Sequence, residues 1–393
     1  MAMTAWTMKM PVSVEFGPTC LERIPDYLHG SRKALVVCGL RKPPASNTAQ
    51  WVCDVLTAAG VECLLYRDIS PEPRSDEVER GGQAAKEFGA QVVVGCGGGS
   101  TMDAAKAIAV AATHPGPILD YRFAGPRAIT AATLPNLAVT TTSGTGSHVG
   151  RVAVISDLAN RRKCPLASDY LYPRAAFCDP RVLCLMPPEV TAVSGFDAFA
   201  QAIEGYLSSV EDPLGNLCAL EALRLISQTL PQAVAHGDDP SLRATMAWAD
   251  TLQGISLATQ GVLIPHVIGM VLGGRYKIPH GRAIACVMAA CLEHSRPGAT
   301  EKLARVAAAM GCPGGLTDTA AADWAIQAIE RLIKQLGIAK SPLDYGVPRD
   351  DFESIGEEVL RDFERRVIAD PVPTDAKGIA AILHRAADRA AAQ

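Results

Sequence analysis

Short apolar runs alternate with amphipathic stretches in the first part of the chain. The apolar runs are rich in β-branched residues and have the length of strands, whereas the stretches between them repeat their apolar residues at helical spacing. The predicted strands are 34–38, 61–66, 91–96 and 137–142, and the predicted helices are 47–59, 76–88 and 104–112. This alternation predicts an α/β fold with a parallel sheet and crossover helices.

From Pro188 onward the apolar pattern is almost continuously helical. The helices predicted there are 195–208, 214–230, 242–259, 299–310, 320–336 and 379–392. The length of 393 residues is enough for two domains of ordinary size. We therefore predict an α/β domain over residues 1–186 and an all-helical domain over residues 187–393.

Three consecutive glycines, Gly97, Gly98 and Gly99, follow the strand predicted at 91–96 and precede an alanine-rich helix. Residues without Cβ let an anionic group approach the backbone, and the helix N-terminus supplies free N–H groups and a positive dipole end. The turn is thus predicted to hold a phosphate, although an ordinary tight turn has the same composition. A second turn rich in glycine and hydroxyls lies at 143–147. Both turns follow strands, at the edge where parallel sheets bind ligands.

The overall charge favours small molecules as partners. The formal net charge is −4, and the chain has no run of lysine or arginine, which argues against nucleic acid and anionic membranes. The first 16 residues lack the pattern of a signal peptide, and no stretch is apolar enough to span a membrane, so we expect a cytoplasmic protein. The twelve cysteines include no Cys-x-x-Cys pair and are interpreted as reduced core thiols.

A candidate metal site lies in the helical half. Asp197 and Gln201 are four residues apart and share a helix face, while His266 and His280 flank a Gly-Gly break. One carboxylate and two imidazoles form a ligand set for Fe(II) or Zn(II) with positions open for substrate. Histidines that are only core or capping residues would give the same spacing.

These motifs, taken in order, resemble the iron-containing (group III) alcohol dehydrogenase family over nearly the full length. The matching segments are 97–106 (the family's GGGSxxDxAK motif), 141–147 (TTxGTGSE), Asp179-Pro180, 195–206, His266 and Pro279-His280-Gly281. The resemblance implies a dehydroquinate synthase-like architecture with an N-terminal dinucleotide-binding domain, a helical C-terminal domain and a cleft between them. It also implies a homodimer.

The resemblance implies roles for individual residues. The residues implied to bind the cofactor are Gly39, Gly97, Gly98, Gly99, Ser100, Asp103, Thr141, Thr142, Thr145, Ser147 and Lys163. The implied catalytic residues and metal ligands are Asp197, His266 and His280, and Gln201 completes the metal set.

Three positions depart from the family pattern. Gln201 replaces a third histidine ligand, so the metal is expected to be held weakly, to be a different ion, or to be absent. Met270 stands where many members have another active-site histidine, which removes a proton relay. His148 replaces the glutamate after GTGS, in a role near the cofactor or as a surface or capping residue.

The cofactor preference is predicted from the end of the first strand. Members that prefer NAD carry an aspartate there for the ribose 2′-hydroxyl, whereas this chain has Gly39, followed by Arg41 and Lys42. Without the carboxylate, and with two cations nearby, the site has room for a 2′-phosphate. We therefore expect NADP(H) to be favoured over NAD(H).

The predicted reaction is hydride transfer between the nicotinamide and a small aldehyde or primary alcohol at a divalent metal. The weakened ligand set leaves open a metal-independent enzyme resembling maleylacetate reductases. Gln201 and Pro265-His266 also resemble a subgroup that reduces acidic aldehydes such as phosphonoacetaldehyde. A dehydroquinate synthase-like lyase, or a cofactor-binding protein without turnover, are further alternatives.

Overall fold

The structure is a computed structural model that describes residues 6–39, 45–210 and 212–391. Arg41 and Lys42, on which part of the NADP(H) prediction depends, lie outside these residues. The chain divides into two compact units. One comprises Met10–Pro187 together with His236–Ala247, and the other comprises Pro188–Ala235 and the chain from Trp248 onward, with the segment before Met10.

The first unit is built on a parallel sheet, as the sequence predicts. In the described residues it has six strands in the order β1-β8-β5-β4-β2-β3, and every neighbouring pair is parallel. The strands are β1 (Ser13–Phe16), β2 (Lys33–Gly39), β3 (Glu62–Ile69), β4 (Val92–Gly97), β5 (Asn136–Thr140) and β8 (Ala175–Cys178). Its helices are α1 (Ala45–Ala58), α2 (Ser75–Phe88), α3 (Gly99–Ala111) and α4 (Pro180–Leu183).

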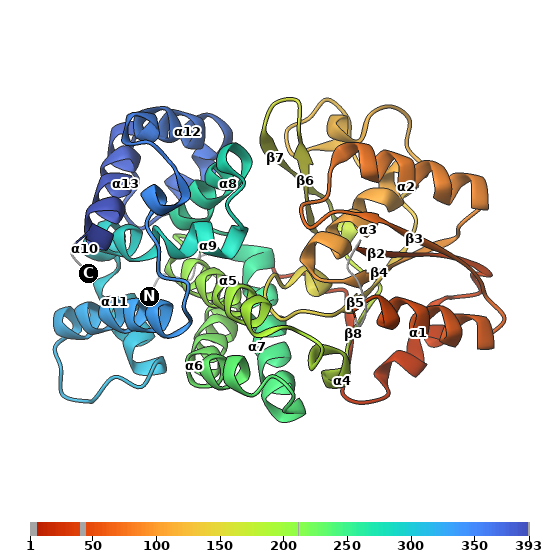
Figure 1. Cartoon of the computed structure of the whole chain (residues 1–393), viewed down its shortest axis with the longest axis horizontal. Coiled ribbons are helices and arrows are strands. Elements are labelled where there is room, and N and C mark those ends of the chain that lie inside the picture. Colours follow the sequence, from red (N-terminus) through yellow and green to blue (C-terminus); the bar gives the residue numbers. More distant parts are fainter. Residues whose placement is uncertain (1–5, 40–44, 211, 392–393) are drawn as a thin grey trace. The chain divides into compact units, whose positions relative to one another are not determined.

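Successive side chains along each strand point to opposite faces of this sheet and pack against helices on both faces. Val36 in β2 and Val94 in β4 pack in a core with α1, whereas Leu35 and Val93 pack in a second core with α2 and α3. Figure 1 shows α1 on one face of the sheet and α2 on the other. Strands buried on both faces need apolar residues at every position, which is why the valine-rich runs are predictive.

A two-stranded antiparallel hairpin, β6 (Val152–Asp157) and β7 (Arg162–Ala167), is not predicted from the sequence. Arg162, Lys163 and Pro165 interrupt the apolar pattern of β7. Short 3₁₀ helices complete the described chain: η1 (Cys20–Tyr27), η2 (Ile118–Tyr121), η3 (Ser147–Val149), η4 (Asp169–Leu171), η5 (Pro342–Tyr345) and η6 (Arg349–Asp351).

The second unit is helical. Its helices are α5 (Pro188–Leu207), α6 (Pro213–Ala235), α7 (Pro240–Gln260, which begins in the first unit), α8 (Ile264–Tyr276), α9 (His280–Ala285), α10 (Met288–Ala309), α11 (Asp318–Gln335), α12 (Phe352–Ile368) and α13 (Ala376–Ala391). The pairs α5 with α6, α10 with α11 and α12 with α13 pack together. Figure 1 shows α12 beside α13. One apolar core joins α8, α9 and α10 to α12 and α13.

Two differences from the predicted helices have physical causes. Helix α10 begins at Met288, and the predicted start, residue 299, is a kink where Ala299 has a φ of −133° just after Pro297. Helix α8 is not predicted, because its residues are apolar almost all round and give no amphipathic period. In the described residues no single helix is long and apolar enough to cross a membrane. Within the described part of the chain, only α7 and α8 taken together, with a bend of 96° between them, reach that length and composition.

Candidate metal and cofactor sites

Three predicted ligands converge in the helical unit. Asp197 from α5, His266 from α8 and His280 from α9 offer ligand atoms that all lie within 4.8 Å of one another. His266 Nε2 is 3.1 Å from Asp197 Oδ1, and His280 Nε2 is 4.0 Å from the same oxygen. Asp197 and His266 are buried, whereas the side chain of His280 is 31% exposed. The three groups thus form a cluster that solvent reaches from the side of His280.

The helix starts place the two histidines. Pro265 occupies the first turn of α8, where its missing N–H is not needed, and His266 follows it. Helix α9 begins at His280 itself. A Cβ on Gly281 would lie 2.4 Å from the carbonyl oxygen of Val193 in α5, so only glycine allows α9 to approach α5 this closely.

Gln201 lies one turn after Asp197 on the same helix face and is buried, with 5% of its surface exposed. Its Oε1 has no hydrogen-bond partner among the described residues. A buried amide oxygen without a partner is costly, and a cation is a natural partner for it. Two imidazole nitrogens, one carboxylate and one amide oxygen suit a divalent ion that accepts nitrogen and oxygen ligands. The residues present therefore fit such an ion.

Glu204 is a further buried carboxylate at this cluster, and no sequence motif singles it out. It is 1% exposed, and its Oε1 accepts a hydrogen bond from His266 Nδ1 at 2.5 Å. Burial disfavours a charged imidazole at His266, but the carboxylates of Glu204 and Asp197 outweigh burial and raise its pKa to about 10. Without an ion, His266 is thus an imidazolium between two carboxylates. Its proton must leave when Nε2 binds a metal.

The two predicted cofactor turns meet in the first unit. A Cβ on Gly97, Gly98 or Gly99 would come within 2.5, 3.1 or 2.4 Å, respectively, of the side chain of Thr101, Thr142 or Thr145. The N–H of Thr141 donates to the carbonyl of Gly97 at 3.0 Å, and the hydroxyl of Ser100 donates to the carbonyl of Pro71. Gly97 and Gly99 are therefore required for packing against threonines, in addition to any phosphate that they admit, whereas Gly98 is only in tight contact with Thr142.

Asp103 and Ser147 bond to each other rather than to solvent. Ser147 Oγ donates to Asp103 Oδ1 at 2.7 Å, and Val154 N donates to Asp103 Oδ2 at 2.9 Å. The buried Lys106 donates to Ser147 O, Ser147 Oγ and Val152 O. Burial raises the pKa of Asp103 and lowers the pKa of Lys106 to about 8. This network ties α3 to the loop after β5 and to β6.

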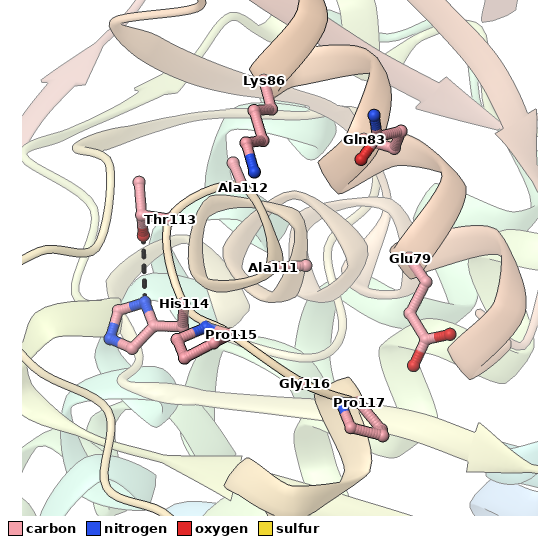
Figure 2. A pocket seen from close by; sticks show the side chains of 10 residues that line it. All are labelled: Glu79, Gln83, Lys86, Ala111, Ala112, Thr113, His114, Pro115, Gly116 and Pro117. Atoms are coloured by element: carbon pink, nitrogen blue, oxygen red, sulfur yellow. Dashed lines mark hydrogen bonds between the residues drawn. The ribbon is translucent and has the colours of Figure 1, made fainter.

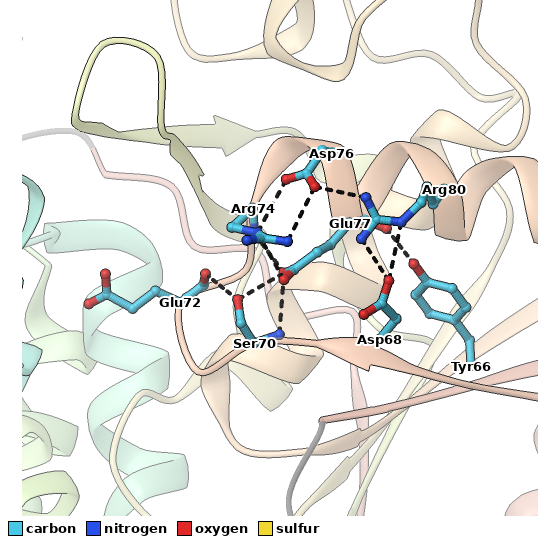
Figure 3. Close-up of polar contacts among 8 residues, drawn as sticks. All are labelled: Tyr66, Asp68, Ser70, Glu72, Arg74, Asp76, Glu77 and Arg80. Atoms are coloured by element: carbon cyan, nitrogen blue, oxygen red, sulfur yellow. Dashed lines mark hydrogen bonds and ion pairs between the residues drawn. The ribbon is translucent and has the colours of Figure 1, made fainter.

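The loop after β3 is fixed by a second polar network. Glu77, which is 2% exposed, accepts hydrogen bonds from Ser70 N, Ser70 Oγ and Arg74 N. Figure 3 shows Ser70 and Arg74 directed toward the Glu77 carboxylate. Lys163, an implied cofactor contact, forms an ion pair with Glu72 in this loop at 3.0 Å. Lys163 is thus attached to the loop.

Gly39 and His148 complete the predicted cofactor positions. Gly39 ends β2, and a Cβ there would only touch Ile69 O at 3.4 Å and Thr101 Oγ1 at 3.5 Å, so a side chain fits. His148 is completely buried, and burial lowers its pKa to about 3, so its imidazole is neutral. A surface role for His148 is therefore wrong.

A hollow of about 500 Å³ lies elsewhere in the first unit (Figure 2). It is lined by Glu79, Gln83 and Lys86 of α2 and by residues 111–117, which end and follow α3. The glycines of the predicted phosphate turn lie at the other end of α3, about 20 Å away along a helix of this length. The hollow thus belongs to neither candidate site.

Comparison with known proteins identifies the family. Residues 11–180 match the family described as iron-containing alcohol dehydrogenase, and residues 191–387 match the C-terminal family of Fe-containing alcohol dehydrogenases. An NAD-dependent methanol dehydrogenase of Bacillus methanolicus is 33% identical over 341 residues, 85% of this chain and 87% of that protein. A sulfoacetaldehyde reductase of Bilophila wadsworthia is 32% identical over 313 residues, 78% of this chain and 80% of that protein.

Solved structures agree with this assignment. The crystal structure of an archaeal halo-thermophilic alcohol dehydrogenase from a Red Sea brine pool superposes with a TM-score of 0.93 and 29% identity, covering 98% of this chain and all of the other. The family that the motifs resemble and the dehydroquinate synthase-like fold are both confirmed. Family membership implies a metal and a nicotinamide cofactor and an oxidoreductase that acts on alcohols or aldehydes. The chain therefore belongs to the iron-containing alcohol dehydrogenase family.

Proposed function

We propose that the protein exchanges hydride between NADP(H) and a small aldehyde or primary alcohol at a divalent metal held by Asp197, Gln201, His266 and His280. The observation that carries this proposal is the convergence of one carboxylate and two imidazoles within 4.8 Å, beside the buried Gln201 Oε1 that has no partner among the described residues. An ion bound there would act as a Lewis acid toward the substrate oxygen while hydride passes to or from the nicotinamide.

Each of the four side chains would have a different role in binding the ion. Asp197 supplies the negative charge that balances a divalent ion, and His266 and His280 supply neutral nitrogen ligands from two other helices. Gln201 adds an uncharged oxygen, a harder and weaker ligand than imidazole. We propose Fe(II) or Zn(II), held more weakly than by the family's usual three histidines.

The substrate is proposed to be a small aldehyde, with an acidic aldehyde as one class. Gln201 with Pro265-His266 favours that class, and a relative named sulfoacetaldehyde reductase supports it. The NADP(H) preference is proposed from Gly39, against the NAD named for the methanol dehydrogenase relative. We also propose a homodimer, which light scattering would detect at about twice 41.4 kDa.

The proposal is tested by NADPH-dependent reduction of short aldehydes, with and without a carboxylate or sulfonate group. The protein is assayed as purified, after chelation, and after addition of Fe(II) or Zn(II). Activity should fall on chelation and return with metal, and the Gln201→His variant should retain its metal at chelator concentrations that strip the wild type. Full activity in metal-free protein would contradict the proposal.

A metal-independent reductase is the second candidate. It is favoured by Gln201, because the loss of one imidazole weakens the ligand set. The same chelation experiment separates the two candidates, since only the second predicts activity that is unaffected by chelation.

A further inference from the structure

The carboxylate of Glu204 contacts His266, one of the three proposed ligands, at Nδ1, the ring nitrogen that does not face Asp197. Glu204 lies seven residues after Asp197 on α5, which places both side chains on one face of the helix two turns apart. Each of its oxygens has its own donor: Oε1 accepts from His266 Nδ1 at 2.5 Å, and Oε2 accepts from Leu263 N at 2.7 Å. The carboxylate therefore connects α5 both to the imidazole and to the backbone that leads into α8.

These two bonds determine which atom of His266 can bind a metal. Since Nδ1 donates to Glu204, Nε2 is the nitrogen left to face Asp197, 3.1 Å away. A carboxylate behind a ligating imidazole fixes the tautomer and the ring plane and makes the ligand more basic. The bond to Leu263, the residue before the first turn of α8, holds the start of the helix that carries the ring.

We infer that Glu204 is a positioning residue, which holds His266 in the ring orientation and tautomer that the proposed metal site requires. This inference rests on the proposed metal site. A purely structural role is the competing explanation, because an acceptor for the backbone N–H before α8 would also stabilise the fold. The two explanations differ in what they predict for metal binding by protein that is fully folded.

The test measures metal affinity in three proteins at one fixed pH. Zn(II) dissociation constants of the wild type, Glu204→Gln and Glu204→Asp are determined by competition with a chromophoric chelator. Glu204→Gln keeps the volume, but its amide can accept from only one of the two donors. Glu204→Asp keeps the charge but is one methylene shorter. Each variant should bind Zn(II) about 10- to 100-fold more weakly than the wild type, the usual effect of losing such a partner.

Two further measurements exclude a general loss of structure. The control variant is Glu358→Gln, which breaks a half-buried ion pair with Arg275 between α12 and α8 but does not contact the cluster. It should lower the thermal midpoint and leave the Zn(II) affinity unchanged. The visible d–d spectrum of Co(II)-loaded protein should change in Glu204→Gln and remain as in the wild type in Glu358→Gln, because only the first alters a ligand's orientation.

The outcomes distinguish a failure of the positioning role of Glu204 from a failure of the proposed metal site. Wild-type affinity and spectrum in folded Glu204→Gln or Glu204→Asp would overturn the positioning role while leaving the metal site intact. A wild-type protein that binds neither Zn(II) nor Co(II) would overturn the metal site itself. If Glu204→Gln does not fold, Glu204→Asp provides the test, since it retains an acceptor and the charge.

Discussion

Gly39 is the described residue from which the proposed NADP(H) preference is inferred. Its missing side chain leaves room at the end of β2, and among the described residues a Cβ there meets neighbours only at ordinary contact distances. Gly39→Asp should therefore be tolerated and should repel a 2′-phosphate. We expect the ratio of kcat/KM for NADPH to that for NADH to fall at least tenfold, which corresponds to about 1.4 kcal/mol. Gly39→Asn is the uncharged control, and a ratio changed equally by both variants would show that charge is not the cause.

Asp370 is predicted to make stability depend on pH. Its Oδ1 accepts from Ser295 Oγ at 2.8 Å and Val372 N at 3.0 Å, and burial raises its pKa from 3.8 to about 6. The folded state thus favours the protonated form, so stability is lost as pH rises from about 4 through 6. The loss approaches 3 kcal/mol at most, by the conversion of about 1.4 kcal/mol per pKa unit.

Asp370→Asn keeps the acceptor and removes this titration. The free energy of unfolding of the wild type, minus that of Asp370→Asn, should fall between pH 4 and pH 7 in denaturant titrations. A difference that stays constant over this range would contradict the raised pKa.

The histidine and aspartate ligands could be proposed from single residues, but Glu204 could not. Asp197, His266 and His280 stand in motifs that are visible in the sequence. In the sequence, Glu204 is an acidic residue in an apolar helix with no spacing that points to a function, and its partner His266 lies 62 residues further along the chain. Only the packing of α8 against α5 reveals the pair. The same holds for Lys106, whose bonds reach 41 and 46 residues away.

Among the helices, the close approach of α9 to α5 brings His280 to Asp197 in the proposed metal site. Gly281→Ala would place a Cβ 2.4 Å from the carbonyl oxygen of Val193, a backbone atom that cannot rotate away. We expect a loss of about 1–3 kcal/mol in the free energy of unfolding and weaker Zn(II) binding, because His280 begins the displaced helix. Denaturant titration and chelator competition measure the two effects.

The matched control is Gly314→Ala. A Cβ at Gly314 would meet nothing within 4 Å among the described residues, and its φ is not in the left-handed range. That variant should be neutral or slightly stabilising. Equal effects of the two substitutions would show that the contact with Val193 does not hold α9 in place.

Many elements with a clear period are predicted from the sequence, although the amphipathic helix α12 is missed, and elements without a clear period are not predicted. The valine-rich strands β2 and β4, the apolar strand β5 and the amphipathic helices α2 and α11 follow the expected patterns closely. Helix α8 has no polar face, and β7 begins with two cations and contains a proline. Both elements form because of the tertiary packing around them, and the apolar pattern of the sequence does not reveal that packing.

At the scale of the whole molecule, family membership and fold follow from motifs spread over nearly the full length of the chain. What the motifs leave undecided is the effect of one substitution, Gln201 for the usual histidine. The buried Gln201 Oε1 and the three converging ligands support a metal in this chain too. We therefore propose that the helical unit binds one divalent ion.

The most direct test is the metal stoichiometry of the purified protein. The wild type and Asp197→Ala are each reconstituted with Zn(II) or Fe(II) and desalted, and their metal content is measured by elemental analysis. Asp197 is the only carboxylate in the proposed ligand set, so its loss should empty the site. We predict close to one ion per wild-type chain and almost none in the variant. Equal metal content in the two proteins, or none in either, would show that Asp197 and its neighbours do not form a metal site.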